Sequence, residues 1–188
     1  MSHLRLVSSR PQLRPEGVGK HVDHPCLETF QREFDYLIRT LRRLGVPSND
    51  VEDLAHEVFL VLFQSWEKYD PERPIRAYLF GIAFRVACNY SRKRKREILY
   101  AVMETTDCAL QPDQELEANQ VRALVLSAMK RVPMQRRAVL IMHDIDKLPM
   151  NEIASNLSIY RFTGYSRLRK ARKELAAALA ALLGASEP

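Results

Sequence analysis

The chain has 188 residues, a length that allows one domain of ordinary size or two small ones. Hydrophobic residues make up 46% of the chain and charged residues 28%, which is typical of a globular protein and argues against a disordered one. None of the six glycines lies in a cluster that follows a strand, so enzymes that hold nucleotides on glycine-rich loops are largely excluded.

The formal net charge is +6, which suits a polyanionic partner without proving one. The distribution of the charge is more informative than its sum. Residues 98–118 contain five acidic and no basic side chains, and they separate two parts of the chain that each contain a basic cluster.

The remaining composition predicts a cytoplasmic protein. The three cysteines, Cys26, Cys88 and Cys108, are odd in number and widely spaced, which favours a reducing compartment over a disulfide framework. The first ten residues are basic but lack the apolar segment of a signal peptide. Because the longest apolar runs are too short to span a bilayer, we expect no membrane insertion.

Helical periods begin after a leader. Residues 1–27 contain three prolines and no helical period, so we expect a flexible leader there. Apolar residues then recur at three- and four-residue spacing until Gly45-Val46-Pro47, which ends the first helix. A second helix over residues 49–67 is expected to bury four apolar side chains, which are Leu54, Val58, Val61 and Leu62.

A turn with two prolines, residues 70–74, separates the second helix from a third. The third helix is expected over residues 76–96, with Leu79, Phe80, Ile82 and Ala83 in the core and a basic run at its end. The residues alone leave open whether Tyr90 on this helix lies in the core or on the surface.

The second half of the chain is also predicted to be helical. Residues 98–114 lose the period and turn acidic, which predicts a linker. Helical segments follow over residues 115–131, 133–143, 149–156 and 161–183, before a short tail, residues 184–188. Because no strand pattern occurs, the predicted fold class is all-α, with two small helical domains, residues 28–97 and 115–183, joined by the acidic linker.

Residues 149–173 have the pattern of a helix-turn-helix. Glu152-Ile153-Ala154 and Leu157 place apolar groups on one face of a short helix, and Ser158-Ile159-Tyr160 forms a tight connection. The next helix would enter the major groove, where arginine binds guanine edges and hydroxyl groups bind phosphate or bases. A solvated amphipathic helix that is merely basic is the alternative. The candidate DNA contacts are Arg161, Thr163, Tyr165, Ser166, Arg167, Arg169 and Lys170.

This segment resembles region 4 of sigma factors of the extracytoplasmic-function (ECF) group. The shared residues are Glu152-Ile153-Ala154, Leu157, Ile159, Thr163, Ser166-Arg167-Leu168 and Ala171-Arg172. The resemblance implies that the second helix of the motif reads a −35 promoter element. Gly164 stands where the family usually has an aliphatic residue, and Lys147 where it usually has glycine. Since glycine destabilises a helix interior by about 0.5–1 kcal/mol, we expect Gly164→Val to stabilise this domain if the helix is regular there.

Residues 50–60 resemble sigma region 2.2, whose surface binds the clamp helices of core RNA polymerase. Carboxylates around an exposed aromatic ring suit a basic helical partner. On spacing alone, Asp53 and Glu57 would be ordinary solvated charges. The polymerase contacts that the resemblance implies are Asp53, His56, Glu57 and Phe59.

Residues 70–74 and 76–83 resemble sigma regions 2.3 and 2.4, which in the ECF group capture an unstacked base of the −10 element. Aromatic faces beside cations suit single-stranded DNA, and a basic run binds phosphate. The candidate −10 contacts are Lys68, Tyr69, Arg73, Arg76, Arg85, Asn89, Arg92 and Lys93.

Both resemblances together imply a sigma factor that binds the clamp helices and flap of core polymerase and promoter DNA, under the control of an anti-sigma factor. It would not be an enzyme, and we expect no catalytic residues and no cofactor. We also expect no metal, because His56-Glu57 lacks a second histidine at residue 60, and His21, His24 and Cys26 lie in the leader. The alternatives are a stand-alone helix-turn-helix regulator that binds an operator as a dimer, and a protein that sequesters polymerase or an anti-sigma factor.

Overall fold

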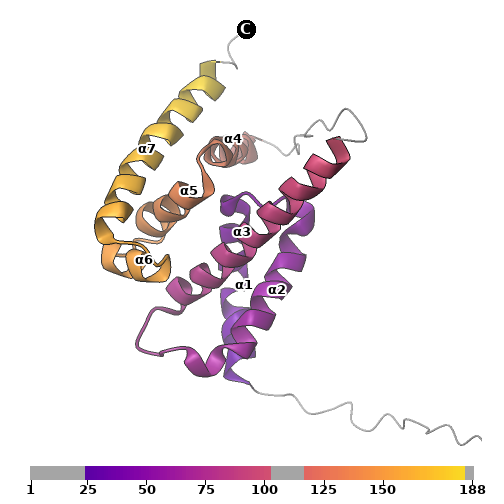
Figure 1. Ribbon diagram of the computed structural model, residues 1–188, viewed down its shortest axis with the longest axis vertical. Coiled ribbons are helices and arrows are strands. Elements are labelled where there is room, and N and C mark those ends of the chain that lie inside the picture. Colours follow the sequence, from indigo (N-terminus) through magenta and orange to yellow (C-terminus); the bar gives the residue numbers. More distant parts are fainter. Residues whose placement is uncertain (1–23, 103–116, 185–188) are drawn as a thin grey trace, which may run out of the picture.

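The computed structural model describes residues 24–102 and 117–184, and every regular element within them is helical. Figure 1 shows two groups of helices side by side, which we call the N-terminal bundle and the C-terminal bundle. The N-terminal bundle consists of α1 (Pro25–Leu44), α2 (Val51–Gln64) and α3 (Ile75–Val102). The C-terminal bundle consists of α4 (Glu117–Arg131), α5 (Met134–Leu140), α6 (Met150–Asn156) and α7 (Arg161–Gly184). The all-α prediction is confirmed for the described residues.

Helix α1 begins inside the predicted leader. Pro25 occupies its first turn, where a missing N–H costs nothing, and the Nδ1 atom of His24 accepts a hydrogen bond from the Cys26 N–H at 3.2 Å. The Cys26 side chain is fully buried. The prediction that the leader extends to residue 27 is therefore wrong over residues 25–27.

The predicted end of α1 is confirmed. Gly45 adopts a left-handed conformation with φ of 94°, and its N–H bonds to the carbonyl of Arg42. The Val46 N–H reaches back to the Leu41 carbonyl at 3.1 Å. Glycine tolerates this conformation because it has no side chain to clash with the following carbonyl.

The second and third helices differ from the prediction in two respects. Val61 is 37% exposed, because the buried stripe of α2 runs through Val51, Ala55, Val58 and Leu62 and leaves Val61 at its edge. Helix α3 continues to Val102 instead of ending near residue 96, since no proline or glycine interrupts it. Its four predicted core residues are buried, and they are Leu79, Phe80, Ile82 and Ala83.

The C-terminal bundle packs α5 and α6 against α7. A single π-helical turn, Ile141–Ile145, continues α5, and Arg172 on α7 holds it with two hydrogen bonds to the Asp144 carboxylate at 2.6 and 2.9 Å. These bonds lower the pKa of Asp144 to about 2, because they stabilise its charged form. The middle of α7 is thereby fixed relative to the π-helical turn after α5.

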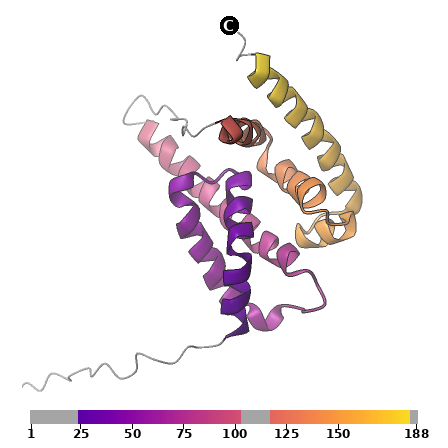
Figure 2. The same ribbon diagram turned by 180° about the vertical axis from the view of Figure 1, so that it is seen from behind.

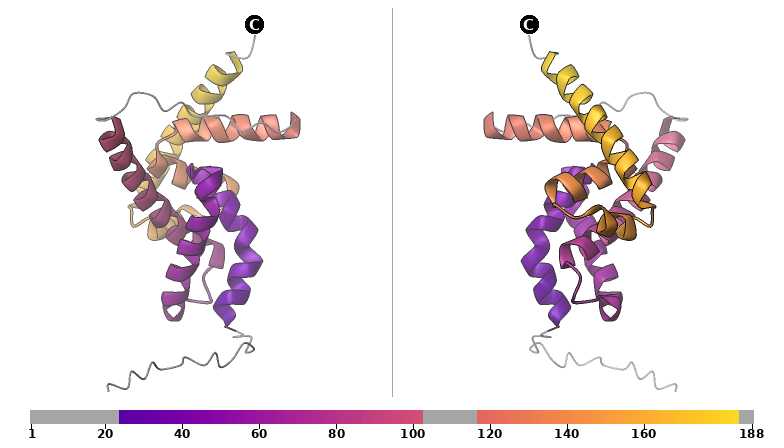
Figure 3. Two further views of the ribbon diagram at one scale, coloured as in Figure 1. Left: turned by 90° about the vertical axis from the view of Figure 1, so that its right-hand side faces the viewer. Right: turned by 90° about the vertical axis from the view of Figure 1, so that its left-hand side faces the viewer.

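The two bundles share one hydrophobic core, which the predicted division into linked domains does not anticipate. Helix α1 contacts α4 and α5, and α3 contacts α6. Figure 2 shows the two bundles side by side from the opposite direction, and Figure 3 shows α4 crossing one end of the N-terminal bundle.

Arg137 is the main polar link between the bundles. Its guanidinium, only 6% exposed, donates hydrogen bonds to the carbonyls of Leu44 at 2.6 Å, Lys130 at 2.8 Å and Val132 at 2.8 Å. These carbonyls belong to the ends of α1 and α4, where helices leave carbonyl groups without partners. Burial lowers the pKa of Arg137 to about 10, so the side chain stays charged at neutral pH.

A second polar link joins α1 to the segment after α5. The Tyr36 hydroxyl donates a hydrogen bond to Asp146 at 2.6 Å. Asp146 is half-buried, and this burial raises the pKa of its carboxyl group. None of the described helices is long and apolar enough to cross a membrane.

Candidate DNA and polymerase interfaces

Helices α6 and α7 form the predicted helix-turn-helix. Between them Ser158 takes a left-handed conformation with φ of 52°, and the Ile159 N–H bonds to the Ala154 carbonyl at 2.9 Å. Leu157 and Ile159 pack against the core and anchor the turn. The second helix of the motif, α7, is thereby held with its N-terminal part at the surface.

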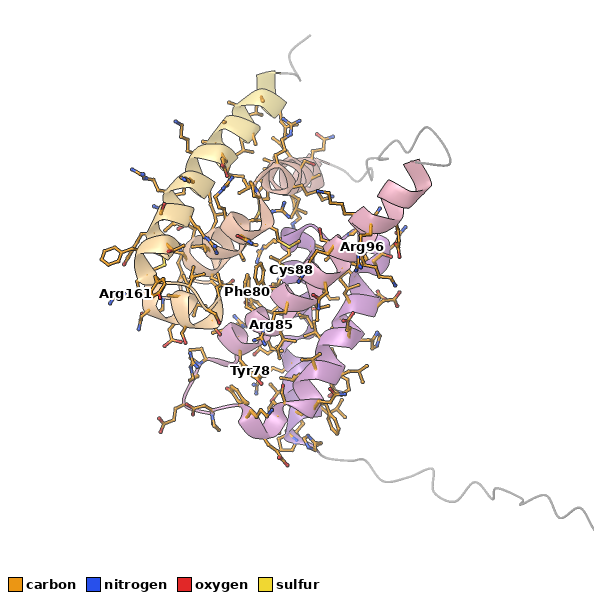
Figure 4. All side chains as sticks on the ribbon, in the orientation of Figure 1. Tyr78, Phe80, Arg85, Cys88, Arg96 and Arg161 are labelled. Carbon is orange, nitrogen blue, oxygen red and sulfur yellow. The ribbon has the colours of Figure 1, made fainter. Side chains whose placement is uncertain are left out.

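The predicted duplex-DNA contacts all lie within about the first three turns of α7. Figure 4 shows Arg161 on the outer side of this helix, away from α3. In the part of the chain that the structure describes, none of these side chains makes a hydrogen bond or an ion pair. The exposed ones are Arg161, Tyr165, Ser166, Arg169 and Lys170, and the half-buried ones are Thr163 and Arg167.

An open groove of about 600 Å³ lies between the start of α5 and α7. Four of the predicted DNA contacts line it, which are Thr163, Ser166, Arg167 and Lys170. The α5 wall contributes Arg136, whose guanidinium is paired with Glu174 at 2.7 Å. Sequence reasoning missed Arg136 and also Phe162, which lines the same groove. The groove therefore combines two unpaired cations, hydroxyl groups and one aromatic ring.

Gly164 lies on the opposite, buried side of α7. The helix is regular there, since the Gly164 N–H bonds to the Tyr160 carbonyl at 3.0 Å. A Cβ atom on residue 164 would overlap the Sδ atom of Met150, which is 4% exposed on α6. The glycine thus allows α6 to approach α7 closely. We therefore expect a valine at residue 164 to destabilise the domain instead of stabilising it, because Met150 occupies the space of the missing side chain.

The predicted polymerase contacts lie on α2. Asp53, His56 and Glu57 are exposed, as expected for a contact surface. The expectation that Phe59 faces outward is wrong in part, because its ring is half-buried and packs against Phe30 at a centroid distance of 4.8 Å.

Two exposed apolar residues on α2 were missed by the sequence prediction. Leu60 is 57% exposed and Phe63 is 48% exposed. The run from Val58 to Phe63 is apolar on all sides of the helix. Because only one side of α2 can pack against the core, this run indicates that apolar side chains on the other side are exposed to solvent. Exposed apolar patches of this kind mark interaction surfaces.

Aromatic rings line the loop between α2 and α3. The ring of Tyr69 lies 5.4 Å from Trp66 and 5.2 Å from Tyr78, measured between centroids. Lys68 and Tyr69 line a small pocket of about 60 Å³ together with Arg73 and Tyr78. The predicted aromatic and basic residues therefore do meet in one place.

The other predicted single-strand contacts lie along α3. Arg76 is bound to the buried Glu33 at 2.7 Å, with its guanidinium 5.1 Å from the centre of the Tyr36 ring. It joins α3 to α1, although its side chain remains partly exposed. The remaining four are exposed on α3, and they are Arg85, Asn89, Arg92 and Lys93. Figure 4 shows Tyr78 and Arg85 on the half of α3 nearest to α6.

Tyr90 proves to be half-buried. Its ring packs against the core, while its hydroxyl is hydrogen-bonded to Asp50 and to Arg94. The sequence left open whether Tyr90 lies in the core or on the surface. Its ring lies in the core and its hydroxyl lies at the surface.

Comparison with known proteins identifies the chain. Residues 29–97 match the family described as Sigma-70 region 2. The chain is 27% identical over 185 residues to the RNA polymerase sigma factor CnrH of Cupriavidus metallidurans, covering 89% of this chain and 97% of that protein. It is also 27% identical to the ECF RNA polymerase sigma factor SigE of Mycolicibacterium smegmatis, covering 93% and 74%. Residues 29–97 belong to the sigma-70 family, and the relatives named above are sigma factors, one of them of the ECF group.

A solved structure has the same fold as this sigma factor. The sigma factor RpoE of Bartonella quintana, in complex with the anti-sigma factor NepR, superposes with a TM-score of 0.63 at 20% identity. The match covers 81% of this chain and 98% of that one. This chain therefore shares its all-α fold with that solved structure.

In this sigma factor the C-terminal bundle contacts the predicted −10 loop. The Arg73 guanidinium lies 3.3 Å from the Glu152 carboxylate and 3.4 Å from the Ser155 hydroxyl, both on α6. Asn156 of α6 also lines the small pocket beside Tyr69. The charge of Arg73 is therefore paired with the C-terminal bundle in this arrangement.

The described residues contain no group of three side chains that could hold a metal ion in this sigma factor. His24 caps α1 and Cys26 is buried in the core, so neither is presented as a ligand. His21 lies outside the described residues, as does Cys108.

Proposed function

We propose that this sigma factor directs core RNA polymerase to specific promoters, with α7 binding the duplex −35 element and the segment from Lys68 to Lys93 melting and holding the −10 element. The observation that carries the proposal is the presence of both surfaces in one chain. One is the N-terminal part of α7, whose exposed basic side chains make no ion pair within the described residues, and the other is a loop of aromatic rings beside cations. A stand-alone regulator has no use for the second surface.

The −35 role of α7 is supported by its free charges. Arg167 and Lys170 face the groove without an acidic partner, so they are available to phosphate and to the acceptor atoms of guanine. Thr163 and Ser166 add hydroxyl groups on the same face. The N-terminal part of a recognition helix is the part that reaches base edges.

The −10 role of region 2 is supported by the stacked rings at its loop. Trp66, Tyr69 and Tyr78 offer π faces to an unstacked base, which any base can use. Exposed Arg92 and Lys93 lie further along α3 and would neutralise phosphate upstream of it.

Binding to core polymerase is assigned to α2. Asp53, His56 and Glu57 form the polar part of the surface, and the exposed side chains of Leu60 and Phe63 supply an apolar centre. The clamp helices and flap of the polymerase are the proposed partners, and the cytoplasm is the proposed site of action. The polymerase performs the chemistry, and this chain positions it.

Control by an anti-sigma factor is part of the proposal. RpoE of Bartonella quintana was solved with its anti-sigma factor NepR, and it shares the fold of this chain. An anti-sigma factor that covers Leu60 and Phe63 on α2 would bury the apolar patch and block polymerase in one contact.

Run-off transcription tests the proposed function. The full chain is mixed with purified bacterial core polymerase on a library of promoter fragments with randomised −35 and −10 elements. Initiation from a defined set of fragments, above that of core polymerase alone, is expected. Binding of the chain to a palindromic operator without added initiation would instead support the stand-alone regulator.

Replacing Arg167 and Arg169 together with alanine is expected to weaken binding to the duplex −35 element by tenfold or more, since one good base contact contributes about 1–3 kcal/mol. Association with core polymerase should be unchanged, because α2 carries it. Fluorescence anisotropy with a −35 duplex and co-purification with core polymerase measure the two effects.

The matched control removes the same charge elsewhere. Arg39 and Arg42 are exposed on α1, far from α7 in the chain, and their joint replacement with alanine should leave duplex binding within about twofold at fixed salt. An equal loss in both double variants would mean that net charge, not α7, determines binding.

A further inference from the structure

An aromatic side chain stands uncovered at the start of the recognition helix. Phe162, in the first turn of α7, is 87% exposed, more than any other large hydrophobic side chain in the described part of the chain. Phenylalanine gains more from leaving water than almost any other side chain, so a ring held in this way is unusual in an isolated protein. It indicates a partner that covers the ring.

The ring lies on the face of α7 that is proposed to bind DNA. Phe162, Ser166 and Lys170 recur at a spacing of four residues, which places them on one side of the helix. All three line the groove between α5 and α7, whereas Gly164 and Leu168 on the opposite side are buried. Phe162 therefore extends the cationic face towards the N-terminus of the helix.

The charges around Phe162 select the class of partner. Arg167 and Lys170 line the same groove without acidic partners, and Arg161 is the preceding residue. A polyanion satisfies these cations, and in the major groove of duplex DNA it also offers one exposed apolar group, the C5-methyl of thymine.

We propose that Phe162 is a specificity-determining residue that recognises a thymine of the −35 element by packing its ring against the thymine methyl group. The inference rests on the proposed −35 role of α7 and adds a base preference to it. Hydrogen bonds from the groove cannot supply this preference, because a methyl group offers no donor or acceptor.

The test removes the methyl group alone. The full chain with core polymerase first selects −35 duplexes from a randomised library, and each thymine of the selected duplex is then replaced singly by deoxyuridine. We expect one replacement to weaken binding about fourfold, the factor that corresponds to burial of one methylene-sized group. With Phe162→Ala, thymine and deoxyuridine duplexes should bind equally, and the selected thymine should no longer be preferred.

Tyr160 provides the matched control. It is 84% exposed two residues before Phe162, just ahead of α7, but it does not line the groove, so Tyr160→Ala should keep the fourfold preference for the methyl group. If deoxyuridine binds as well as thymine at every position, or if Phe162→Ala keeps the preference, the assignment is overturned while the sigma function stands. If no −35 sequence is selected at all, the proposed role of α7 itself fails.

Discussion

Replacing Arg137 with alanine is expected to lower the free energy of unfolding by about 3 kcal/mol. The guanidinium is buried and donates to three carbonyls, those of Leu44, Lys130 and Val132. Each buried carbonyl that loses its hydrogen bond costs about 1–3 kcal/mol. Part of this cost is offset, because the variant no longer buries a charged guanidinium. The stability of Arg137→Lys should lie between that of the unaltered protein and that of Arg137→Ala, because one ammonium group cannot span three carbonyls as a planar guanidinium does.

The loss should also separate the two bundles, because Arg137 joins the end of α1 to the end of α4. The single tryptophan, Trp66, lies between α2 and α3 and reports mainly on the N-terminal bundle. In chemical denaturation, Trp66 fluorescence and helical circular dichroism should change together in the unaltered protein. In Arg137→Ala, part of the helical signal should be lost at lower denaturant than the fluorescence change.

Arg136 is the natural comparison for Arg137. It is the neighbouring residue with the same side chain, but its ion pair with Glu174 is partly exposed. Arg136→Ala should therefore destabilise the protein by less than about 1 kcal/mol. Equal effects of the two substitutions would refute the role assigned to Arg137.

The sequence predicts the helices well because their signals are local. The end of α1 follows from Gly45 and Pro47, and the helix-turn-helix follows from apolar spacing over residues 149–173. The start of α1 is less predictable, because the prolines of residues 1–27 suggest a loop, whereas proline also suits the first turn of a helix, where Pro25 lies.

The contact between the bundles was not predictable in this way. Arg137 and Leu44 are 93 residues apart, and Arg73 and Glu152 are 79 apart. Nothing in the local pattern around these residues says which partner each will find. Gly45 illustrates the point, since its role in ending α1 is evident from the sequence. Its second role, leaving room for the Arg137 guanidinium where a Cβ would clash, is not evident.

The polymerase surface shows a related limit. Because α2 is apolar on several sides between Val58 and Phe63, hydrophobicity alone does not decide which side faces the core. The sequence prediction placed Phe59 outward and Val61 inward, whereas the structure half-buries Phe59 and exposes Leu60, Val61 and Phe63.

The second large effect is expected at the helix-turn-helix, where Gly164→Val should lower the free energy of unfolding by about 1–2 kcal/mol. Inserting a side chain into a packed interior costs about 1–3 kcal/mol, and the better helix propensity of valine returns a few tenths. The inserted atoms would meet the buried Met150 side chain, so α6 would be pushed away from α7. Thermal unfolding followed by circular dichroism measures the change.

Met150 makes the explanation testable. Met150→Ala alone should cost about 2–5 kcal/mol through the cavity it leaves, and the valine at residue 164 should partly fill that cavity. The double variant should therefore be less destabilised than the sum of the two single ones, with a coupling of about 0.5–3 kcal/mol. Gly184→Val serves as the control, since a Cβ there meets no neighbouring atom and the protein should keep its stability. Additive effects at residues 150 and 164 would show that Gly164 is retained for a reason other than its contact with Met150.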